Sequence, residues 1–141
     1  MFGVADTTGA LEIAALRELM AECSGLLTTL HRVFDEVPDQ MVAWEQAIDL
    51  GFDRILTSGG APDALTGAEQ ISKLITASCG RIGILPGAGI GPDNARDVLR
   101  ITGAEELHAS CKMVGRDASG DTERVAVDPE RVQALRAIMD Q

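Results

Sequence analysis

The stretch RIGILPGAGIGPDNARDVL, residues 81–99, decides the fold. Its apolar run ends at Pro86 and is followed by three glycines within the next five residues. After Pro92 the apolar residues Ala95, Val98 and Leu99 repeat with helical spacing. A short buried strand, a glycine-rich turn and an amphipathic helix make one βα unit.

The same alternation of a short apolar run and a longer amphipathic one recurs along the chain. Helical spacing is clear at Leu16, Leu19 and Met20, between the first two runs. The pattern predicts a single α/β domain over residues 1–141, with about five βα units, a parallel sheet and a polar loop at 111–125. The predicted strands start 24 to 28 residues apart and are Phe2–Ala5, Leu26–His31, Arg54–Thr57, Arg81–Pro86 and Glu105–Ser110.

Several residues indicate where the helices begin and end. Pro129 suits a first helical turn, and Thr66 with Glu69 has the spacing of a capping box. Gly51 and Gly103 stand where glycine commonly ends a helix.

Polar residues follow the predicted strands at their carboxyl ends, among them Asp6, His31, Thr57 and His108. In a (β/α)8 barrel the loops after the strands build the site, so this distribution favours a barrel over a doubly wound sheet. A complete barrel needs about 250 residues, so the sequence predicts a partial TIM (β/α)8 barrel.

Charge and cysteine usage exclude several classes of protein. The chain carries 12 basic and 22 acidic residues, for a net charge of −10, which disfavours nucleic acid as a partner. No run has the length of a membrane span, so no membrane partner is expected. Cys23, Cys79 and Cys111 are an odd number without CxxC spacing, which favours a reducing compartment and predicts a cytoplasmic protein.

Four motifs, FGVAD (2–6), TLHRVFD (29–35), RILTSGGAPDALTG (54–67) and ILPGAGIGPDNARDVLRITGAEELHAS (84–110), resemble the copper homeostasis CutC family. Their order is similar to that of the C-terminal part of the family. The resemblance implies a cytoplasmic (β/α)8 barrel, a role in copper binding or trafficking and Cu+ as the metal. It also implies that the five predicted strands are the fourth to eighth of the barrel. Leu30, Val33 and Ala88 depart from the family motifs, Ala88 by replacing the middle glycine of Pro-Gly-Gly-Gly.

On this resemblance the chain lacks the N-terminal βα units. Whether Met1 is the true start, or the chain is a C-terminal fragment or a truncated product, stays open. Two unpaired edges, at Phe2–Ala5 and Glu105–Ser110, are expected to promote aggregation or a homo-oligomer.

The candidate site residues follow the predicted strands. His31, Arg32, Asp35 and His108 are the candidates for catalysis, although Arg32 and Asp35 also suit a structural ion pair. The glycine loop either presents backbone amides to an anion or is only a turn. The predicted anion-binding residues are Arg32, Ser58, Gly59, Gly87, Gly89, Asn94 and Ser110.

Soft donors near the end of the last predicted strand are the candidates for copper. Cys111 and Met113 form a C-x-M pair near His108, and thiolate, thioether and imidazole suit Cu(I). Two functions are therefore predicted. The first is a role in copper homeostasis, and the alternative is a barrel enzyme acting on a small phosphorylated or carboxylated metabolite. Whether the chain is an enzyme stays open.

Overall fold

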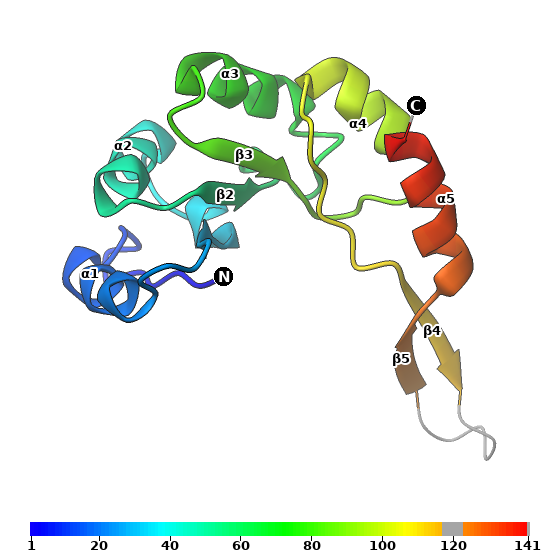
Figure 1. The fold of residues 1–141 in the computed structure, drawn as a ribbon, viewed down its shortest axis with the longest axis horizontal. Helices are drawn as coiled ribbons and strands as arrows, with labels where there is room; N and C mark the ends of the chain where they lie inside the picture. The colour runs from blue at the N-terminus through cyan, green and yellow to red at the C-terminus, as the bar shows by residue number, and fades with distance from the viewer. Residues whose placement is uncertain (117–122, 141) are drawn as a thin grey trace.

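The computed structural model describes residues 1–116 and 123–140 and confirms an α/β fold (Figure 1). Within these residues, helices α1 to α5 follow an arc along one side of the strands. No helix in this part of the chain is long and apolar enough to span a membrane. The elements are α1 (Ile13–Glu22), β1 (Thr29–Leu30), the 3-10 helix η1 (Arg32–Asp35), α2 (Gln40–Leu50), β2 (Arg54–Thr57), α3 (Ala68–Ser78), β3 (Gly83–Pro86), α4 (Ala95–Thr102), β4 (Lys112–Arg116), β5 (Glu123–Val127) and α5 (Pro129–Met139).

The central sheet is parallel and has the order β1-β2-β3. Leu30 pairs with Ile55, which pairs in turn with Ile84, so the three strands share one register. The prediction for residues 54–57 is confirmed with the same bounds.

The two predicted edge strands are wrong as continuous strands. Phe2 makes one parallel bridge to Leu30, and His108 makes one to Gly87. Both segments therefore lie where the outer strands of a larger parallel sheet belong, although neither forms a ladder. The prediction for residues 26–31 is also too long, since only Thr29 and Leu30 are in β1.

The prediction of a polar loop at 111–125 is wrong where the structure describes these residues. β4 and β5 pair antiparallel, with Met113 opposite Ala126, and extend away from the rest of the chain (Figure 1). Residues 117–122 of the predicted loop lie outside the described residues.

The structure confirms three of the predicted helix-end signals and contradicts one. Gly51 and Gly103 end α2 and α4 in the left-handed conformation, and Pro129 opens α5, as predicted. The capping box is wrong, because α3 begins after Gly67 and the Thr66 hydroxyl donates to Asp63 instead.

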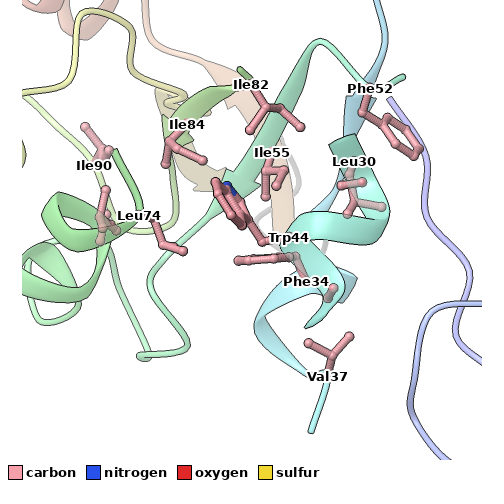
Figure 2. Close-up of a cluster of buried hydrophobic side chains, with 14 of the residues drawn as sticks. Leu30, Phe34, Val37, Trp44, Phe52, Ile55, Leu74, Ile82, Ile84 and Ile90 are labelled. Atoms are coloured by element: carbon pink, nitrogen blue, oxygen red, sulfur yellow. The ribbon is translucent and has the colours of Figure 1, made fainter. Parts of the chain in front are cut away.

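The core fills the space between the sheet and the helices (Figure 2). Ile55 is fully buried and Ile84 is 8% exposed, and both belong to the same apolar cluster as Trp44 of α2. Burying one such side chain contributes about 1.5–3 kcal/mol. Leu56 alternates to the other face of β2, where it lines a cleft.

Candidate functional site

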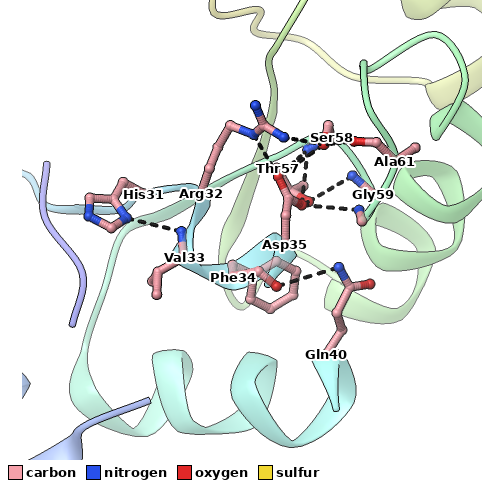
Figure 3. A network of polar contacts seen from close by, with 11 residues as sticks. His31, Arg32, Val33, Phe34, Asp35, Gln40, Thr57, Ser58, Gly59 and Ala61 are labelled. Atoms are coloured by element: carbon pink, nitrogen blue, oxygen red, sulfur yellow. Dashed lines mark hydrogen bonds and ion pairs between the residues drawn. The ribbon is translucent and has the colours of Figure 1, made fainter. Parts of the chain in front are cut away.

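A hydrogen-bond network centred on Asp35 joins the segments that follow β1 and β2 (Figure 3). The Asp35 carboxylate accepts from Arg32 Nε at 2.7 Å, from the Thr57 hydroxyl, and from the Ser58 amide at 3.0 and 3.1 Å. The Gly60 amide also donates to it, at 3.1 Å. The Asp35 side chain is only 5% exposed, so these donors replace water around its charge.

The protonation state of Asp35 follows from two opposed effects. Burial by itself raises the pKa of the carboxyl group, but the hydrogen bonds from Thr57, Arg32, Ser58 and Gly60 outweigh it. The net pKa lies below the ordinary value, so Asp35 is ionised at neutral pH. The group is therefore suited to hold the two loops together and is unsuited to act as a general acid.

Arg32 and His31, the other two polar residues after β1, have different surroundings. Arg32 pairs with Asp35 and also donates from Nη2 to Ser58 Oγ at 2.9 Å, yet its side chain is 43% exposed. His31 Nδ1 accepts from the Val33 amide at 3.0 Å and so caps η1 (Figure 3). The structure thus contains the structural ion pair that was one of the two interpretations of Arg32 and Asp35.

A cleft of about 570 Å³ lies at the carboxyl ends of the parallel strands. Among the described residues, its lining includes four that are or can become cationic and no Asp or Glu, in a chain whose net charge is −10. The cleft is lined by Arg32, Leu56, Pro62, Ala88, Gly89, Ile90, His108, Ala109, Ser110, Cys111, Lys112 and Arg131.

The glycine loop contributes three consecutive residues to this cleft, Ala88, Gly89 and Ile90. Within the described residues, the backbone N–H groups of these three make no hydrogen bond. Ala88 has φ 82° and Gly89 has φ 67°, so the loop places a non-glycine residue in the left-handed region. The loop therefore brings three amides that lack a partner within the described residues to the lining of the cleft, at the cost of backbone strain at Ala88.

The predicted anion-binding residues divide into two groups. Arg32, Gly89 and Ser110 line the cleft, whereas Ser58, Gly59, Gly87 and Asn94 do not. Asn94 braces the loop instead: its Oδ1 accepts from the Gly91 amide and its Nδ2 donates to the Gly89 carbonyl, both at 2.9 Å.

The candidate copper ligands are also divided. Cys111 and His108 line the same cleft, while Met113 lies on β4 and is 48% exposed. No group of three or more His, Cys, Asp or Glu suited to a metal ion occurs within residues 1–116 and 123–140.

Sequence reasoning missed two cleft residues, Lys112 and Arg131. Lys112 adjoins Cys111 at the start of β4, and Arg131 lies in the first turn of α5. No local pattern marks either one, because each reaches the cleft only through the packing of the C-terminal segment.

A second cleft, of about 480 Å³, lies at the opposite ends of the strands. Its single described cation is paired, since Arg54 Nε contacts Glu106 Oε2 at 2.6 Å, and Asp53 and Glu105 add negative charge. The unpaired donors described above are confined to the first cleft, so it is the stronger candidate site.

Parallel strands joined by helices, with a cationic cleft at the carboxyl ends of the strands, define an α/β protein with a candidate ligand-binding cleft. The profile of the CutC family matches residues 1–113. A CutC family protein of Caulobacter vibrioides is 42% identical over 151 residues, which cover 96% of this chain and 61% of the relative. One from Agrobacterium fabrum is 44% identical over 114 residues, 81% of this chain and 45% of the relative. The chain belongs to the CutC family.

A solved structure agrees with this assignment. The copper homeostasis protein CutC of Streptococcus agalactiae, so named in its description, aligns with a TM-score of 0.71 and 27% identity. The alignment covers 75% of this chain and 52% of that one. The chain thus spans about three fifths of the Caulobacter vibrioides relative and about half of the solved structure.

Proposed function

We propose that this chain serves copper homeostasis in the cytoplasm, as part of a (β/α)8 barrel whose cleft binds a small anion. Family membership supports the role in copper homeostasis, because the Streptococcus agalactiae relative is named as a copper homeostasis protein. The order of the parallel segments, from Phe2 through β1, β2 and β3 to His108, supports the barrel. The three cysteines are all free, which suits a reducing compartment.

One observation carries the molecular part of the proposal. The cleft combines Arg32, Lys112 and Arg131 with the amides of residues 88–90, and within the described part of the chain these amides have no partner and no carboxylate lines the cleft. Backbone amides and guanidinium groups aimed at one space are the usual protein partners of phosphate and carboxylate. The net charge of −10 repels anions at long range, so the affinity rests on these local donors.

The test is equilibrium binding of inorganic phosphate, acetate and citrate, by calorimetry, to the wild type and to Gly89→Val. Residue 89 has φ +67° and a Cβ there lies 3.0 Å from Asp63 Cβ, so a bulky side chain disturbs the loop. Gly103→Val is the matched control, since φ is +71° there and no described residue other than its chain neighbours lies within 4 Å of the added Cβ. We expect Gly89→Val alone to lose binding. Equal binding by both variants, or no binding by the wild type, refutes the proposed site.

The placement of Cys111 and His108 in one cleft favours a second candidate, direct binding of Cu(I). A thiolate and an imidazole suit this soft ion, and together they offer two ligands. Competition with a Cu(I) chelator tests this candidate by comparing the copper affinity of Cys111→Ser with that of a control, Cys79→Ser. Cys79 is an exposed cysteine outside the cleft. Equal copper affinity of the two variants eliminates Cys111 as a ligand. An enzyme acting on the bound anion is the remaining alternative, with His108 as the cleft residue able to transfer a proton.

A further inference from the structure

We propose that Arg131 is a ligand-binding residue of the cleft and that the ligand it selects carries a phosphate group. This inference rests on the proposed binding of an anion in the cleft and names its chemical class. Arg131 is not among the site residues predicted from the sequence.

The position of Arg131 is fixed from two sides. Asp128 caps α5 by accepting from the Glu130 amide at 2.9 Å and the Arg131 amide at 3.4 Å, which holds Arg131 in the first turn. Its guanidinium lies against Gly91, at the end of the glycine loop, because a Cβ at residue 91 would be 2.6 Å from Nη2. Apart from the chain neighbours of Gly91, no other described residue lies within 4 Å of that added Cβ. Because residue 91 is a glycine, no side chain there fills the space that the Arg131 guanidinium occupies.

The guanidinium is left without a complete set of partners. Arg131 Nε is buried and, within the described residues, has no hydrogen-bond partner. Among the described residues no carboxylate forms an ion pair with Arg131, and Asp128 accepts from backbone amides instead. The other charged or titratable groups that line the cleft are Arg32, His108, Lys112 and the Cys111 thiol. The first three cannot accept from a guanidinium while cationic, and a thiol is a weak acceptor. An exogenous acceptor is the partner that this arrangement lacks.

The number of donors favours phosphate over carboxylate. The donors of the cleft are the side chains of Arg131 and Lys112 together with the amides of residues 88–90. They outnumber the hydrogen bonds that the two oxygens of a carboxylate accept with good geometry. A phosphate group presents three terminal oxygens, carries up to two charges and matches the fork of a guanidinium. The cleft volume of about 570 Å³ exceeds that of the phosphate group, and Leu56 and Pro62 give it an apolar wall. The ligand is thus a small phosphomonoester.

The experiment measures calorimetric affinities of inorganic phosphate, glycerol phosphate and acetate for the wild type and three variants. Arg131→Met removes the guanidinium, and Gly91→Ala displaces it without requiring a left-handed backbone. Arg136→Met is the control, since it removes the same charge from the same helix, where Arg136 is exposed and paired with Asp140. Circular dichroism establishes that each variant is folded.

We expect glycerol phosphate to bind more tightly than inorganic phosphate, and both more tightly than acetate. Arg131→Met and Gly91→Ala should each weaken phosphate binding at least about tenfold, the loss typical of a hydrogen bond to a charged group, and Arg136→Met less than about twofold. Wild-type phosphate affinity in both Arg131→Met and Gly91→Ala overturns the role of Arg131 but leaves anion binding intact. Preference for acetate overturns the phosphate class alone, whereas a wild type that binds no anion overturns both proposals.

Discussion

Replacing Asp35 with alanine should destabilise the chain strongly, because its carboxylate is the acceptor for donors that water cannot reach. Thr57 and Ser58 are fully buried. Asp35→Ala leaves the Thr57 hydroxyl and the Ser58 amide without an acceptor, whereas Ser58 Oγ retains the Ala61 carbonyl at 2.6 Å. Gly60 and Arg32 are exposed enough for water to replace the lost bond.

Two orphaned buried donors at about 1–3 kcal/mol each give an expected loss of about 2–6 kcal/mol. That is a large part of the roughly 5–15 kcal/mol that holds a typical domain folded. Urea unfolding followed by circular dichroism measures it, with Asp140→Ala as the control because its partner Arg136 is exposed. The control should leave the midpoint nearly unchanged. A loss below about 1 kcal/mol for Asp35→Ala would show that the network does not hold the two loops together.

Three further predictions follow from the strain, the charges and the exposed surface. Ala88→Gly should raise the thermal midpoint, because Ala88 has φ 82° and left-handed backbone costs a non-glycine residue about 1–2 kcal/mol; an unchanged or lower midpoint argues against strain there. Because the pKa of Asp35 is lowered by folding, its contribution to stability is present above the unfolded pKa of about 3.9 and is lost as the pH falls further. The stability difference between wild type and Asp35→Asn should therefore shrink on acidification, and a difference that stays constant contradicts this. Leu26 and Leu27 are 68% and 75% exposed, so the purified chain should self-associate in sedimentation experiments and Leu27→Asp should reduce this; a monomeric wild type refutes it.

The sequence predicted β2 well because burial constrains it on both faces, whereas β1 and β3 are shorter than predicted. Ile55 and Leu56 are buried on opposite faces next to strong turn residues, and residues 54–57 form β2 with the predicted bounds. The segments at Phe2 and His108 were predicted as strands too, but each pairs with the parallel sheet through a single bridge. A sequence pattern indicates whether a segment can form a strand in a complete sheet. Whether it forms a continuous hydrogen-bonded ladder depends on which neighbouring strands are present.

The site was less predictable than the fold, for a geometric reason. The glycine loop and Arg32 were found because they directly follow predicted strands, and they lie in the cleft. Ser58 follows a strand too, but Asp35 holds it in a buried network that only tertiary contacts reveal. Arg131 reaches the glycine loop from α5 through the packing of the C-terminal segment, and no spacing within its own helix signals that contact.

The most direct test of anion binding in the cleft is a nuclear magnetic resonance titration of the isotope-labelled chain with inorganic phosphate. The amide signals of Ala88, Gly89 and Ile90 report on the donors that have no partner within the described residues. We predict saturable shifts of these three signals, with the Arg131 side-chain Nε signal moving at the same phosphate concentration. Shifts that do not saturate, or that spread over the surface while residues 88–90 stay unchanged, would contradict the account.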